Sequence, residues 1–123
     1  MSSPQADAPT LFLFEWNAEA AATRAAGLRA AGWQVETESG DIGRGVRRVL
    51  DLKPVVVVLD LARRSSYSRE AAMSIRGFRA SRRQMLVFVD GTKDEQKRIA
   101  ECVLDPIFVV GETLVQRLDG LRD

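Results

Sequence analysis

The chain has 123 residues, of which 46% are hydrophobic and 28% charged, and its formal net charge is +1. This is the size and composition of one globular domain, and a charge so close to zero gives no electrostatic case for binding nucleic acid or a membrane. The chain has no histidine and one cysteine, which excludes a histidine-based catalytic pair, a histidine-ligated zinc site and an intrachain disulfide.

The first residues differ in composition from the rest. Residues 1–9 are polar or small and predict a flexible tail, with a single domain over residues 10–123. They lack the charged and apolar regions of a signal peptide, and no apolar run approaches the roughly 18 residues of a membrane span. We therefore expect a cytoplasmic protein.

Apolar runs alternate with helical patterns along the chain. The runs predict five strands, at residues 11–14, 33–37, 54–60, 85–89 and 107–110. The helical patterns cover residues 18–31, 42–52 and 69–81, a segment that begins after Thr92 and is broken at Asp105, and a last segment after Gly111. The side chains expected to cap helix starts are Asn17, Asp41, Ser68, and Thr92 with Glu95. Residues 63–67 are expected to form a loop.

The order of the strands follows from their polarity. Residues 55–59 are four valines and a leucine, so both faces of this strand are expected to be buried, as in the centre of a parallel sheet. Residues 33–37 alternate between apolar and polar, as an edge strand does. The sequence therefore predicts a three-layer α/β fold with a doubly wound parallel sheet in the order 2-1-3-4-5, counting strands along the chain.

Several apolar residues are assigned to the core from their positions. Trp33 opens the edge strand, and residues 108–110 continue the last one. Ala71, Ile75 and Phe78 are expected to form a buried stripe of one helix. Cys102 is expected to be buried or half-buried.

Acidic residues follow the predicted strands directly: Glu15 after the first, Asp60 at the end of the third and Asp90 after the fourth. Ligands of open parallel sheets bind outside the carboxyl ends of the strands, so these three residues predict one acidic pocket. An alternative is that Asp60 only caps the loop that follows it.

The order of the elements, the length and the position of Asp60 resemble the receiver domain of bacterial response regulators, over residues 11–122. The resemblance implies a flavodoxin-like fold of the chemotaxis-receiver type, with Asp60 in the place of the phosphorylated aspartate. Ser68-Arg69-Glu70 stands where receivers often have a Gly-x-Glu sequence.

The other family positions differ. Glu15 takes the first of the two acidic positions, but Trp16 takes the second, which in the family binds magnesium directly. Val89, or Asp90 if the alignment moves by one residue, stands for the family's Thr or Ser. Gly111 stands for its Lys, Glu112 for the Pro that usually follows, and Arg64 for another Pro. The pattern therefore resembles a degenerate receiver, or pseudo-receiver.

These differences predict a weak site for phosphoryl transfer. With Glu15 and Asp60 as its only clear ligands, Mg²⁺ would keep most of its water and bind weakly. Phosphoryl transfer to a carboxylate needs a cation to neutralise the phosphate oxygens, and the family's switch needs its Thr and Lys. We therefore expect no catalytic residue and no tightly held cofactor, and conventional phosphorylation of Asp60 is the less favoured hypothesis.

Basic and aromatic residues beside the acids allow more than one interpretation. Arg63 and Arg64 either pair with the surplus carboxylates or bind an anion. Trp16 either fills the former metal pocket or stacks on a ligand or partner. The arginines of residues 69–83 fit an ordinary solvated helix face better than an anion site.

Two functions of different classes follow. The first is a non-catalytic signalling module that binds another protein, or a second copy, through the face formed by residues 93–103 and 107–121. The second is a flavodoxin-like module that binds a nucleotide or another anion with Trp16, Arg63 and Arg64. An enzyme with its own turnover is not expected.

Overall fold

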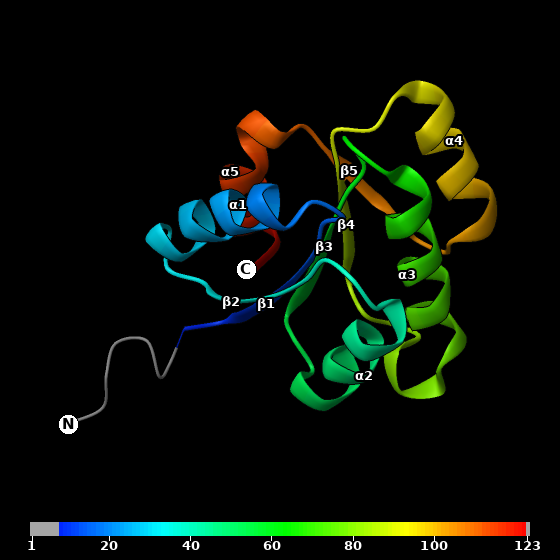
Figure 1. Ribbon diagram of the computed structural model, residues 1–123, viewed down its shortest axis with the longest axis horizontal. Coiled ribbons are helices and arrows are strands. Elements are labelled where there is room, and N and C mark those ends of the chain that lie inside the picture. Colours follow the sequence, from blue (N-terminus) through cyan, green and yellow to red (C-terminus); the bar gives the residue numbers. More distant parts are fainter. Residues whose placement is uncertain (1–7, 123) are drawn as a thin grey trace.

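The computed structural model describes residues 8–122, which form a parallel sheet of five strands between two layers of helices (Figure 1). The strands are β1 (Thr10–Phe14), β2 (Gln34–Glu38), β3 (Val56–Asp60), β4 (Leu86–Val89) and β5 (Ile107–Val109). The helices are α1 (Ala18–Ala30), α2 (Ile42–Leu52), α3 (Ser65–Gly77), α4 (Lys93–Cys102) and α5 (Leu114–Arg122). The strand order is β2-β1-β3-β4-β5, which confirms the predicted fold class and the edge position of the second strand. Most of the predicted tail, residues 1–7, lies outside the described residues.

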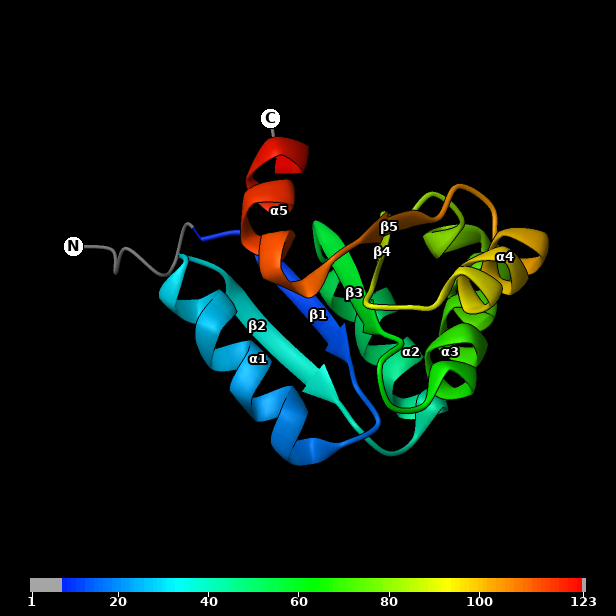
Figure 2. The ribbon, with the colours of Figure 1, turned by 90° about the horizontal axis from the view of Figure 1, so that it is seen from above.

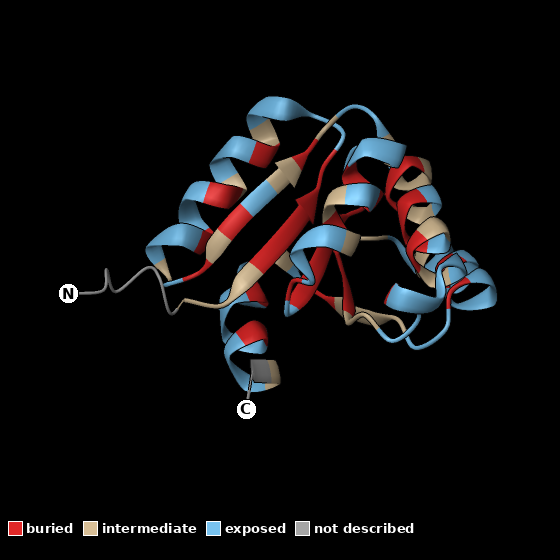
Figure 3. Ribbon diagram, turned by 90° about the horizontal axis from the view of Figure 1, so that it is seen from below, coloured by how far each residue is buried: buried red, intermediate tan, exposed pale blue. Residues whose placement is uncertain are grey.

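The helices cover both faces of the sheet. Helices α1 and α5 lie on one face, and α2, α3 and α4 lie on the other (Figure 2). Successive side chains of β3 point to opposite faces, so Val56 and Val58 pack in the core beneath α1 and α5. Val57 and Leu59 pack in the core beneath the other three helices. Strands β3 and β4 are therefore buried along their whole length, and β1 is buried from Leu11 onward (Figure 3).

The predicted cap of three helices is confirmed. Asn17 accepts a hydrogen bond from the backbone N–H of Ala20 at 2.9 Å, and Asp41 accepts one from Arg44 at 3.0 Å. Thr92 and Glu95 form a reciprocal capping box at the start of α4. These side chains satisfy amides that have no partner within the helix, which fixes where each helix begins.

The predicted start of α3 is wrong. The helix begins at Ser65, so residues 65–67 belong to it and Ser68 lies in its first turns. Ser68 is buried, and its hydroxyl donates to the backbone carbonyl of Asp60 at 2.6 Å. The helix can begin before Ser68 because residues 63–67 contain no glycine or proline that would interrupt it. The hydroxyl of Ser68 satisfies the carbonyl at the end of β3 and does not cap the helix.

Three residues assigned to the core or near it are exposed. Phe78 is 47% exposed because α3 ends at Gly77, so Phe78 no longer follows the helical spacing of Ala71 and Ile75. Val110 is 59% exposed because β5 ends one residue earlier. Cys102 is exposed as well, since the inward positions of α4 are taken by residues 99 and 103.

Gly45 has a packing role in α2. A Cβ at this position would lie 2.5 Å from the ring of Phe14 and 2.9 Å from the side chain of Glu38. Glycine usually weakens a helix, but here the missing side chain lets α2 approach β1 closely.

Candidate functional site

The three predicted acidic residues meet at the carboxyl edge of the sheet. Glu15 follows β1, Asp60 ends β3 and Asp90 follows β4. Glu15 and Asp60 are 1% and 2% exposed, whereas Asp90 is exposed. Two carboxylates that are this deeply buried require compensating cations or hydrogen-bond donors.

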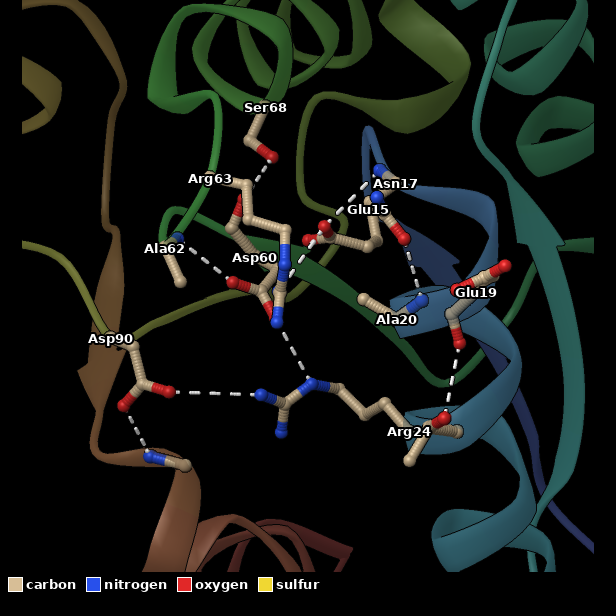
Figure 4. A network of polar contacts seen from close by, with 12 residues as sticks. Glu15, Asn17, Glu19, Ala20, Arg24, Asp60, Ala62, Arg63, Ser68 and Asp90 are labelled. Carbon is tan, nitrogen blue, oxygen red and sulfur yellow. Dashed lines mark hydrogen bonds and ion pairs between the residues drawn. The ribbon is translucent and has the colours of Figure 1, made fainter.

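The cation nearest to Asp60 comes from helix α1. Arg24 donates from Nε to Oδ2 of Asp60 at 3.1 Å, and its Nη2 lies 3.6 Å from Oδ2 of Asp90 (Figure 4). The other oxygen of Asp60 accepts the backbone N–H of Ala62 at 2.8 Å. One guanidinium thus connects α1 to the ends of β3 and β4, and both oxygens of Asp60 already have donors.

Asp90 is held by the backbone as well as by Arg24. It has a positive φ of 60°, and its Oδ1 accepts the N–H of Gly111 at 2.7 Å. A Cβ at Gly111 would lie 2.6 Å from Oδ2 of Asp90. The carboxylate of Asp90 therefore occupies the space in front of the position that the resemblance assigns to the family's lysine.

Glu15 has its own cation. Arg63 lies 3.3 Å from Oε1 of Glu15, which also accepts the N–H of Asn17 at 3.2 Å. Burial and the nearby charge of Asp60 raise the pKa of Glu15, and the donors from Asn17 and Arg63 only partly oppose this. Of the two alternatives left open for Arg63 and Arg64, pairing with a carboxylate therefore holds for Arg63, whereas Arg64 contacts Trp16 instead.

Trp16 and Arg64 lie beside the acids. The guanidinium of Arg64 lies 4.2 Å from the centroid of the Trp16 ring, and the Trp16 and Tyr67 rings pack edge to face with their centroids 5.4 Å apart. Trp16 is 44% exposed. A side chain that filled the former metal pocket would be enclosed, so this exposure favours the other alternative, in which Trp16 is available to stack on a ligand or partner. With Tyr67, Glu70 and the first residues of α2, Trp16 and Arg64 line a hollow of about 300 Å³.

The residues present do not fit a magnesium ion. Mg²⁺ prefers several oxygen ligands in octahedral geometry, but Glu15 and Asp60 direct their oxygens at arginines and backbone amides. The indole of Trp16 offers no lone pair to a hard cation. Within residues 8–122, no group of three or more acidic, histidine or cysteine side chains is arranged to hold a metal ion.

Sequence reasoning missed Arg24. This residue comes three positions after Ala21 and four before Leu28, both of which are buried, so it lies on the inner side of α1. An arginine at that spacing in an otherwise Ala-rich stretch is a signal that it is held by a buried acid. Helical spacing would therefore have indicated Arg24 as a partner of the strand-end carboxylates.

Sequence reasoning also missed a third buried carboxylate, that of Glu38 at the end of β2. Arg44 contacts both its oxygens, at 2.8 and 2.7 Å, and these hydrogen bonds lower the pKa of Glu38. The hydroxyl of Tyr67 donates to the backbone carbonyl of Glu38 at 3.2 Å. Burial and the charge of Glu38 raise the pKa of Tyr67 to about 12.

No protein-family model and no curated protein matches the sequence. Among solved structures, the chemotaxis protein CheY4 of Vibrio cholerae superposes with a TM-score of 0.77 at 17% identity, covering 93% of this chain and 98% of that one. A putative response regulator from Chloroflexus aurantiacus has the same TM-score at 13% identity, with 94% and 98% covered. This chain has the receiver fold.

The receiver domain of the sensor histidine kinase PA1611 from Pseudomonas aeruginosa has the same fold. It superposes with a TM-score of 0.71 at 16% identity over 92% of this chain and 98% of its own, and its structure has a magnesium ion coordinated in the active-site cleft. In the present chain the strand-end carboxylates contact Arg24 and Arg63.

Proposed function

We propose that this chain is a degenerate receiver, a signalling module of a two-component system that acts by binding another protein without phosphorylation of Asp60. The observation that supports it is the contact of Arg24 with Asp60 at 3.1 Å, together with that of Arg63 with Glu15. We further propose that the module has no turnover of its own and works in the cytoplasm. None of the helices within residues 8–122 has the length and apolar content that crossing a membrane requires.

Both oxygens of Asp60 and the cation beside it are already engaged. Phosphoryl transfer needs a free, aligned nucleophilic oxygen and a cation that neutralises the phosphate as it arrives. Asp60 uses one oxygen for Arg24 and the other for the amide of Ala62. Arg24 is also drawn to Asp90, so its charge is shared by two carboxylates before any phosphate approaches. The arginine thus takes the place of the cation and fixes the site in one state.

Intact mass after incubation with acetyl phosphate and Mg²⁺ tests this proposal, with Asp60→Asn as the control. The expected result is no phosphoryl adduct on the wild type while circular dichroism shows an intact fold. An adduct on the wild type that is lost in Asp60→Asn would overturn the proposal in favour of an atypical phosphorylated receiver.

For the binding surface we propose the face of α4, β5 and α5. Strand β5 is an edge strand of three residues, and the exposed side chains of Val110 and Val115 continue its apolar surface. The partner is another signalling protein or a second copy of the chain. Light scattering of the wild type and of Val110→Glu/Val115→Glu distinguishes these: a dimer lost in the variant identifies a second copy. If neither self-association nor capture of a signalling partner depends on these two residues, the face is wrong.

A second function is supported by the hollow beside Trp16. Its exposed indole and the guanidinium of Arg64 could hold a planar anion such as a nucleotide. A ligand present at 100 times its dissociation constant stabilises a protein by about 2.7 kcal/mol, so a thermal-shift series with nucleotides tests it. A shift lost in Trp16→Ala supports this function, and the absence of any shift removes it.

A further inference from the structure

A surface at the opposite edge of the sheet carries apolar residues that the site does not use. The loops that precede parallel strands meet at the amino edge, and four large apolar side chains are exposed there. These are Leu52, Val55, Phe78 and Leu104, with exposed fractions of 41%, 46%, 47% and 70%. They make up half of the large exposed apolar residues within the described chain.

Basic residues come from the same loops as these apolar side chains. Lys53, Arg79, Arg82 and Arg83 are all exposed and come from the same loops. Within residues 8–122 their side chains form none of the ion pairs or hydrogen bonds of the structure. We call these four cations and the four apolar residues the basal surface. The exposed acids Asp51 and Asp105 come from the same segments, so the excess charge is positive, and the four cations are free to meet a partner, unlike Arg24 and Arg63.

The basal surface has a fixed shape because its loops are tied together. Gln84 donates to the carbonyl of Pro54 at 3.0 Å, and Arg76 donates to the carbonyls of Leu104 and Gln84. Between the loops lies a hollow of about 200 Å³, lined by Val49, Leu50 and Pro54 and by the cations Lys53 and Arg83. Water takes roughly 30 Å³ per molecule in the liquid, so the hollow has room for an apolar side chain of a partner.

We propose that the basal surface docks an acidic protein segment that inserts an apolar side chain between the cations. Four unpaired cations select for negative charge, and the apolar lining of the hollow supplies affinity that charge alone does not. A nucleic-acid backbone would leave the four apolar side chains unused, and a flat anionic membrane would not fill a recessed hollow. This inference is independent of the proposed function, because it involves neither Asp60 nor the α4–β5–α5 face.

Fluorescence anisotropy with the full chain tests the proposal. The probe is a fluorescein-labelled peptide of alternating glutamate and aspartate with one leucine and one phenylalanine, compared with the same peptide in which glutamine and asparagine replace the acids. The test variant is Arg82→Glu/Arg83→Glu. The matched control, Arg98→Glu/Arg117→Glu, reverses two exposed charges on α4 and α5 instead. Phe78→Ser tests the apolar part of the surface.

We expect saturable binding of the acidic peptide and no saturable binding of the peptide with glutamine and asparagine. The affinity falls by about tenfold or more in Arg82→Glu/Arg83→Glu, changes by less than about twofold in the control and falls in Phe78→Ser. No saturable binding, or equal losses in both double variants, would overturn the proposal. Binding of polyuridine or phosphatidylserine vesicles that depends on Arg82 and Arg83, without binding of the peptide, would also overturn it.

Discussion

Arg24→Met removes the charge beside Asp60 and keeps much of the aliphatic stem. Removing one partner of a fully buried ion pair costs about 3–5 kcal/mol, and a hydrogen bond to a charged group contributes about 1.5–3 kcal/mol. Arg24 keeps 22% of its side chain exposed, and Asp60 retains the amide of Ala62, so the lower range applies. We expect a loss of about 2 kcal/mol, or roughly 8 °C in Tm for a domain of this size.

A double-mutant cycle isolates the contact. In an Asp60→Asn background residue 60 carries no charge, so Arg24→Met should cost less than about 0.5 kcal/mol, which gives a coupling energy near 1.5 kcal/mol. Urea unfolding at neutral pH measures all four proteins, and Arg117→Met on the exposed side of α5 is the matched control. Equal costs of Arg24→Met in the two backgrounds would refute the assignment of Arg24 as the partner of Asp60.

Three further predictions follow from burial and packing. The pKa of Glu15 is raised, so the folded state binds this proton more tightly than the unfolded state does. The stability of the wild type therefore falls as the pH rises from the free value of 4.5 through the pKa of the folded state. Glu15→Gln should be more stable than the wild type at neutral pH but not below pH 4.5. Tyr67, the one tyrosine of the chain, should ionise near 12 in an absorbance titration. Gly45→Ala should cost about 1–2 kcal/mol because its Cβ meets Phe14, whereas Gly27→Ala, with open space around it, should gain up to about 1 kcal/mol.

A specific result would contradict each of the predictions for Glu15, Tyr67 and Gly45. A stability difference between Glu15→Gln and the wild type that is the same at both pH values would show that the fold does not raise the pKa of Glu15. Tyrosinate absorbance that appears near the ordinary 10 while the protein remains folded would show that Tyr67 is not buried beside Glu38. Equal effects of the two alanine substitutions would show that α2 does not approach β1 closely at Gly45.

The fold could be predicted because the pattern of apolar and polar residues in each strand shows which of its faces are buried. The valines before Asp60 leave no polar face, and residues 33–37 alternate, so the central and edge strands can be told apart. Glu15, Asp60 and Asp90 could be brought together for the same reason, since parallel strands end at one edge.

The partners of these carboxylates were harder to predict. Arg63 follows Asp60 closely in sequence, whereas Arg24 reaches it from a helix that contacts the sheet only after folding. Ser68 has the composition of a cap, and only the tertiary contact with the carbonyl of Asp60 shows its use. Local propensity cannot separate these alternatives, because long-range packing decides between them.

In this site arginines hold the carboxylates where a divalent cation would otherwise bind. A Mg²⁺ titration followed by amide NMR tests this most directly, because the amides of Asn17 and Ala62 donate to Glu15 and Asp60 themselves. We expect no saturable shift of either amide in the wild type and a saturable shift of the Ala62 amide in Arg24→Met, where the Asp60 oxygen facing α1 is released. Saturable shifts of both amides in the wild type would contradict this expectation, since Mg²⁺ would then displace the arginines.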